Sequence, residues 1–167
     1  MQFSEHFQSA EFEKPDVMPA ECFDIFKLLC TEILERVRAY VTKSITITSG
    51  YRSPEHNTEI HGSPTSEHVA SSTWCAADFT FDTTFGMMMS VRKVFDWIRN
   101  SPSLPFHQVI LEHAANGSTI IHVSINTGKV GIREALEGST YNASPYTSWE
   151  CVAYNPLSGQ ESENVGT

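Results

Sequence analysis

Two short runs of alternating apolar and polar residues, 75–82 and 120–125, constrain the fold of this chain most. Successive side chains of a β-strand point to opposite faces, so each run predicts a strand with one apolar face. The apolar faces comprise Cys75, Ala77, Phe79 and Phe81 in the first run and Ile121, Val123 and Ile125 in the second. Asp78 and His122 fall on the opposite faces. The sequence therefore predicts a sheet with a core on one side and polar ligand atoms on the other.

A third candidate ligand, His68, ends the short motif Ser66-Glu67-His68. Histidines and aspartates of this kind are most often ordinary hydrogen-bonded groups, so no one of the three is specific alone. Together, two His and one Asp form a three-ligand set that leaves a fourth tetrahedral position for water, as catalytic zinc sites do. A structural zinc site would more often use Cys. The three residues predict one bound Zn²⁺.

The remaining pattern predicts helices and strands around these two runs. An apolar stripe at spacings of three and four predicts a helix over 20–41, and a similar stripe that includes Met88 predicts a second helix over 85–100. Strands are predicted over 44–48, 106–113 and 120–126, the last two flanking the hairpin signal Asn116-Gly117. Together they indicate a single α+β domain.

Other segments carry weaker signals. Residues 1–18 are expected to form an arm packed on the domain, with Ser9 capping a short turn, and residues 53–67 to form a loop in which His56 and His61 are exposed. Residues 131–136 are expected to form a short turn of helix. The segment 141–154 fits an additional strand, a binding patch or a lid, with simple packing as the default.

Several motifs occur in the order typical of a known family. They are Ser49-Gly50-Tyr51-Arg52-Ser53-Pro54, Asn57, Gly62-Ser63, Ser66-Glu67-His68, Ala76-Ala77-Asp78-Phe79 and Ile121-His122-Val123-Ser124, preceded by Phe3-Ser4-Glu5-His6-Phe7. From Phe3 to Ser124 the chain resembles the zinc D-Ala-D-Ala peptidases, most closely their small phage and bacterial members. That family shares its fold with the hedgehog signalling domain.

The resemblance implies a fold and roles for residues. Helices would pack on one face of a small, mainly antiparallel sheet, with a zinc cleft on the other face. His68, Asp78 and His122 would bind the zinc ion. Arg52 would belong to the catalytic set and hold a carboxylate of the substrate, for which its planar donor fork is suited. Ser66 would contact the substrate.

The spacing of the ligands departs from the family pattern. Asp78 lies ten positions after His68 instead of seven, as if three residues were inserted around residues 71–74, and Trp74 stands where the family has Gly. Cys75 occupies the usual position of the Asp ligand and is a rival for it. The Ala-x-Asp-Phe context favours Asp78.

Glu112 is the candidate catalytic base. If the hairpin turn centres near residues 116 and 117, Glu112 lies opposite or nearly opposite His122 on the same strand face. Many relatives place an acidic residue three positions before the last His, whereas this chain has Thr119 there. Glu67 and His113 are fallback candidates, although His113 should face away from Glu112.

Composition sets the broad class. The 167 residues, 40% of them hydrophobic, suit one domain over 1–155 with a polar tail over 156–167. A formal charge of −9 without a basic cluster argues against nucleic acid or an anionic membrane as partner. No CxxC pair is present, so Cys22, Cys30, Cys75 and Cys151 are interpreted as reduced core thiols.

The expected function is that of a zinc peptidase cleaving peptidoglycan stem or cross-link peptides, as carboxypeptidase or endopeptidase. Because no apolar signal segment opens the chain, cytoplasmic synthesis is expected, and with it either a phage lysin that needs a separate membrane-permeabilising partner or a virion component. The alternative is a zinc-stabilised virion or cell-wall-binding module without catalysis. The altered spacing, the missing Gly and Thr119 motivate that alternative.

Overall fold

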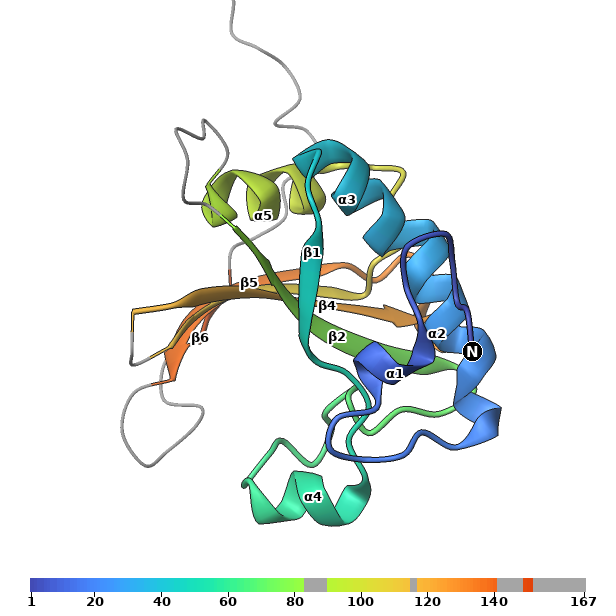
Figure 1. Ribbon diagram of the computed structural model, residues 1–167. Helices are drawn as coiled ribbons and strands as arrows, with labels where there is room; N and C mark the ends of the chain where they lie inside the picture. The colour runs from blue at the N-terminus through green and yellow to red at the C-terminus, as the bar shows by residue number, and fades with distance from the viewer. Residues whose placement is uncertain (83–89, 115–116, 141–148, 152–167) are drawn as a thin grey trace, which may run out of the picture.

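A twisted six-stranded sheet forms the centre of the described part of the protein (Figure 1). The computed structural model describes residues 1–82, 90–114, 117–140 and 149–151. In the sheet order β1-β2-β4-β3-β5-β6, the strands are β1 (Ile45–Ser49), β2 (Trp74–Phe81), β4 (Thr119–Asn126), β3 (Gln108–Ala114), β5 (Glu134–Thr140) and β6 (Trp149–Cys151). All neighbouring pairs are antiparallel except β3 and β5, which are parallel. The predicted α+β class with a mainly antiparallel sheet is confirmed.

The two alternating runs form the neighbouring strands β2 and β4, and their side chains point to the predicted faces of the sheet. β2 and β4 pair so that Asp78 lies directly opposite His122, while Ala77 lies opposite Val123 on the other face. Ala77, Val123 and the other apolar side chains on their face are buried. Alternation along both strands therefore separates a core face from a polar face.

Helices cover the core face of this sheet (Figure 1). A continuous helical segment consists of a 3₁₀ turn (Ala20–Cys22), α2 (Phe23–Leu29), a π-helical stretch (Cys30–Leu34) and α3 (Glu35–Val41), as predicted for 20–41. Its apolar stripe, with Phe26, Cys30 and Val37, is fully buried. Among the described helices, none combines the length and the apolarity needed to cross a bilayer.

Helix α5 (Val91–Asn100) also packs on the core face, against β3 and β4. It begins later than the predicted residue 85, because Ser90 has extended backbone angles and its side chain accepts a hydrogen bond from the Lys93 N–H. The predicted part of the helix over 85–89, with Met88, lies outside the described residues.

The N-terminal arm packs on the domain as predicted. Its short helix α1 (Ser9–Phe12) places Phe12 5.3 Å from Phe26, measured between ring centroids. The predicted cap was wrong: Gln8 is the N-cap, and its backbone N–H donates to Glu11 Oε1 at 2.8 Å. Ser9 lies inside the helix, where its buried hydroxyl accepts a hydrogen bond from the N-terminal amine.

The segment 53–67 differs from the sequence prediction of a loop. It contains a helix, α4 (Pro54–Glu59), because Ser53 caps the helix and Pro54 suits its first position. His56 is not an exposed loop residue either, since its Nδ1 lies 2.8 Å from Asp16 Oδ2. The exposed position of His61 is as predicted.

Residues 134–136 begin strand β5, although a short turn of helix was predicted over 131–136. From Glu134 onward it pairs in parallel with β3, and Ile110 lies opposite Leu136. This long-range pairing overrides local helix propensity. Of residues 141–154, only β6 is described, in agreement with the additional-strand alternative, and the predicted tail over 156–167 lies outside the described residues.

Candidate metal centre

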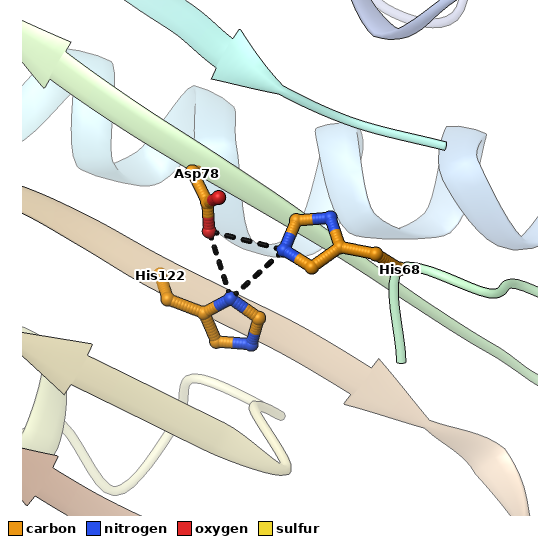
Figure 2. Close-up of side chains that lie close together, drawn as sticks. All are labelled: His68, Asp78 and His122. Atoms are coloured by element: carbon orange, nitrogen blue, oxygen red, sulfur yellow. Dashed lines mark hydrogen bonds and ion pairs between the residues drawn. The ribbon is translucent and has the colours of Figure 1, made fainter. Parts of the chain in front are cut away.

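Three side chains converge on the polar face of the sheet (Figure 2). Asp78 comes from β2, His122 from β4, and His68 from the loop that follows α4. Asp78 Oδ1 lies 2.8 Å from His122 Nδ1 and 3.1 Å from His68 Nε2, and the two ring nitrogens are 3.2 Å apart. All three residues are buried, with exposed fractions of 3% for His68, 5% for Asp78 and 8% for His122.

This geometry fits a tetrahedral metal ion. Ligand bonds of about 2.0–2.1 Å place the ligand atoms of a tetrahedral zinc site roughly 3.3 Å apart. The three ligand atoms are already close to that separation, and all lie within 4.8 Å of one another. Two imidazoles and one carboxylate are also a donor set that zinc prefers. The cluster could therefore hold a metal ion with little rearrangement.

The His68 ring is oriented by the backbone of Gly50. His68 Nδ1 lies 2.6 Å from the Gly50 carbonyl oxygen, which can only accept, so Nδ1–H donates to it and Nε2 is the ring nitrogen directed at the cluster. The Arg52 N–H also donates to the His68 carbonyl oxygen at 3.0 Å. These two hydrogen bonds from segment 50–52 thus hold His68, which lies in a loop, next to the sheet.

Gly50 is required where the N-terminal arm crosses this segment. A Cβ atom at Gly50 would lie 2.5 Å from the Cα and the carbonyl oxygen of Phe12. The Tyr51 N–H donates to the same Phe12 carbonyl oxygen at 2.9 Å. The arm therefore packs against Gly50, and Gly50 in turn accepts the hydrogen bond that orients the ligand His68.

Arg52 lies beside the Asp78 carboxylate. Its Nη2 is 3.3 Å from Asp78 Oδ2 and 3.0 Å from Ser49 Oγ. Burial disfavours ionisation of Asp78, but the charges and hydrogen bonds of His68 and His122 outweigh it and hold the pKa of Asp78 well below its ordinary value. Asp78 is therefore ionised, as a metal ligand must be.

Glu112 lines a cleft of about 240 Å³ beside the cluster, together with Arg52 and Ser66. Glu112 lies opposite Ile120, and Ile110 lies opposite His122, so Glu112 is not directly opposite His122 but two residues away along β3. The shift of two residues keeps Glu112 on the same face as His122. Burial, followed by the charge of Asp78, raises the pKa of Glu112, although His122 and Arg52 partly oppose the shift.

The rival ligand Cys75 lies away from the cluster. It faces the helices, where its Sγ lies 3.5 Å from the Ile25 carbonyl oxygen, and burial raises the pKa of its thiol. The residues inserted before β2 form an exposed turn, in which the Ser71 N–H donates to the Trp74 carbonyl oxygen at 3.0 Å. The three additional residues between His68 and Asp78 thus lie outside the cleft, and Asp78 still lies opposite His122.

The two fallback bases have other partners. Buried Glu67 also lines the cleft, but its carboxylate is held by His107 at 2.9 Å and by Asn126 at 2.7 Å. His113 lies 2.9 Å from Glu137 Oε1 and is not among the residues that line the cleft. Thr119 pairs with His113 and differs from His122 by three positions, so it faces the helices. The position three residues before His122 therefore does not face the cleft, whereas Glu112 of β3 does.

Among the strand residues that line the cleft, sequence reasoning missed three: Gln108, Ile110 and Leu136. The first two share the alternation of Glu112 and could have been found by it. Leu136 could not, because its segment was predicted to be helical. The Glu67 partners His107 and Asn126 carried no sequence signal.

An α+β domain with a buried His₂Asp cluster in a cleft defines a class of candidate mononuclear metalloproteins. Within this class, the Peptidase M15 family model matches residues 5–100, more than half of the chain, and the protein belongs to that family of metallopeptidases. The matched region includes His68 and Asp78 and ends before Glu112 and His122. No curated protein matches the chain.

Proposed function

We propose that this protein is a zinc-dependent peptidase that hydrolyses stem or cross-link peptides of peptidoglycan. The convergence of His68, Asp78 and His122 carries the proposal, together with membership of the Peptidase M15 family. The substrate class rests on the resemblance of the ordered motifs to the D-Ala-D-Ala peptidases. The same resemblance supports action at the bacterial cell wall, either with a separate membrane-permeabilising partner or as part of a virion.

His68, Asp78 and His122 would hold the zinc ion, which when bound supplies a Lewis acid and an acidified water. Glu112 would accept a proton from the attacking water and return it to the leaving amine. Its position in the cleft and its raised pKa support this role, because a base works best with a pKa nearer to the working pH.

Arg52 would orient both the site and the substrate. Its contact with Asp78 Oδ2 leaves Oδ1 directed at the two imidazoles. The same side chain lines the cleft, where a guanidinium can hold a substrate carboxylate. Ser66, also in the cleft, offers a hydroxyl for hydrogen bonding to the peptide.

Digestion of purified muropeptides, with and without a chelator, tests this function. Mass analysis should show chelator-sensitive cleavage. Loss of one terminal amino acid would identify a carboxypeptidase, and separation of cross-linked dimers would identify an endopeptidase. Intact muropeptides after incubation with protein that carries stoichiometric zinc would contradict the proposal.

A non-catalytic, zinc-stabilised virion or wall-binding module is the second candidate. Thr119 favours it, because the chain has no acidic residue three positions before His122. This module would bind zinc and peptidoglycan without cleaving any muropeptide. A pull-down with insoluble peptidoglycan, run beside the digestion, separates the two candidates.

A further inference from the structure

A second cavity, of about 450 Å³, lies between α2, the end of β4, the loop before β3 and the loop after β4. None of the described residues that line it also lines the metal cleft. Its walls are mainly apolar and include half-buried Leu28 and the buried side chains of Leu104, Phe106 and Ile125. Mainly apolar cavities of about 300–1,000 Å³ with a few polar groups are typical of small-molecule sites.

One buried polar atom in the wall of this cavity is unsatisfied. His107 lines the cavity and is only 3% exposed, and its Nε2 has no hydrogen-bond partner among the described residues. Its Nδ1 lies 2.9 Å from Glu67 Oε2, and because a carboxylate oxygen accepts, Nδ1–H donates to it. Nε2 is therefore the ring nitrogen that is left to bind a molecule in the cavity. A ligand that pairs with such a buried atom removes the cost of leaving it without a partner.

The position of the His107 ring is fixed by the surrounding fold. Its partner Glu67 also accepts a hydrogen bond from Asn126 Nδ2 at 2.7 Å, and Asn126 itself lines the cavity. The His107 backbone N–H donates to the Ser124 carbonyl oxygen at 2.8 Å. The imidazole is thus held between the loop that carries Glu67 and strand β4, so Nε2 has a defined place before any ligand binds.

The other polar side chains of the cavity limit the charge of a ligand. The guanidinium of Arg133 lies 4.2 Å from the centre of the Phe106 ring and donates to the Ser101 carbonyl oxygen at 2.7 Å, so it forms part of the wall. Glu32 and Lys129 line the cavity at exposed positions, and their opposite charges favour neither an anion nor a cation. A hydroxyl group can donate and accept, so it pairs with Nε2 in either protonation state of the ring.

We propose that this cavity is a second binding site, separate from the metal cleft, for a small uncharged ligand with an apolar body and one hydroxyl group that pairs with His107 Nε2. The proposal does not depend on peptidase activity, because the two sites share no lining residue in the described part of the chain.

Phenol and toluene test the proposal, because they have nearly the same shape and differ in the hydroxyl group. NMR titration of zinc-loaded, ¹⁵N-labelled protein with each compound should shift the amide signals of residues that line the cavity. Phenol should bind about 10-fold more tightly than toluene, the difference expected for one buried hydrogen bond. Equal affinities, or shifts confined to the metal cleft, would overturn the proposal. Absence of any shift would also overturn it and would mean that the cavity holds only water.

His107→Asn separates the roles of the two ring nitrogens. The Asn amide can replace Nδ1–H as the donor to Glu67 and has no counterpart of Nε2, so the affinity for phenol should fall to that for toluene. His61→Asn is the matched control, because His61 is exposed, lines neither cavity and has a φ of 55°, which Asn tolerates. A 10-fold preference for phenol that persists in folded His107→Asn protein would overturn the proposal.

A second variant tests the location of the site without changing His107. Leu28→Trp places a larger side chain in the wall of the cavity from a half-buried position, so it should weaken the binding of both compounds. Unchanged affinities for phenol and toluene in this variant would show that they bind elsewhere, which contradicts the proposed site.

Discussion

Gly50 shows how a residue without a functional side chain can control the metal centre. Its carbonyl oxygen accepts the His68 Nδ1–H, and its missing Cβ makes room for the backbone of Phe12. Gly50→Ala should therefore move either the arm or the carbonyl oxygen. We expect a loss of zinc affinity of about 10- to 100-fold, as is typical when a partner of a ligating His is disturbed.

Competition with a chromophoric chelator measures that affinity. Gly128→Ala is the matched control, because a Cβ there would meet only Asn126 Oδ1, at 3.4 Å. Equal zinc affinity in Gly50→Ala and wild-type protein would show that the Gly50 contact does not orient His68.

Glu112→Gln tests the proposed base. The substitution keeps the shape of the side chain and removes its proton acceptor, so fold, zinc content and peptide binding should persist while kcat falls on the order of 10²-fold or more. Steady-state kinetics with matched zinc loading measure this. His113→Ala is the control, since His113 lies outside the set of residues that line the cleft. An active Glu112→Gln enzyme beside an inactive His113→Ala enzyme would reject the assignment.

At the level of single residues, the sequence predicted which metal ligands come together but not the contacts that orient each of them. Alternation assigned Asp78 and His122 to one face, and the order of motifs added His68. Period-2 alternation also gave the correct face of Glu112. Its exact partner, Ile120, was left open because register depends on turn geometry, which the sequence does not fix. The Glu67 contacts span 40 and 59 residues of chain and left no local pattern.

Among the elements, the N-terminal arm depends on one carboxylate of α3. Glu35 accepts hydrogen bonds from the Ser4 hydroxyl at 2.7 Å and from the His6 N–H at 2.8 Å. Burial opposes its ionisation, but these bonds and the His6 ring, 2.8 Å away, lower the pKa of Glu35. A lowered pKa in the folded protein means that Glu35 stabilises the fold above its unfolded pKa, about 4.3. That contribution is lost as the pH falls through the lower folded pKa.

Glu35→Gln should accordingly reduce the free energy of unfolding at pH 7 and flatten its decline below about pH 4.3. Urea denaturation at a series of pH values measures both effects. Glu59→Gln makes the same change of charge at an exposed site and is the matched control. Identical pH slopes for Glu35→Gln and wild-type protein would mean that Glu35 does not secure the arm.

The elements that sequence predicted well are those with strong internal periodicity. The helical segment 20–41 and strands β1, β2 and β4 follow from their own apolar patterns. Helix α4 was missed because the Pro, Gly and Ser content of residues 53–67 obscured the cap at Ser53. Strand β5 was missed because its parallel partner β3, and not its composition, determines its conformation.

For the whole molecule, zinc should act as a stabilising ligand. The three ligands come from a loop and two strands, so an ion that binds all of them favours the folded chain over the unfolded one. At a free zinc concentration 100 times the Kd, the stabilisation is about 2.7 kcal/mol. Calorimetry should show a rise in Tm with zinc that His122→Ala removes. A Tm independent of zinc would contradict the site.

The pairing of β2 with β4 also has a consequence for folding rates. Asp78 and His122 are neighbours in the sheet but are separated along the chain by α5 and β3. Contacts of such long range carry a high loop-closure cost and tend to form late, so the transition state for folding should contain little of the ligand cluster. Zinc would then slow unfolding and leave the folding rate nearly unchanged, which stopped-flow measurements with and without the ion can determine. The bound ion would thereby lengthen the lifetime of the native state without guiding the chain toward it.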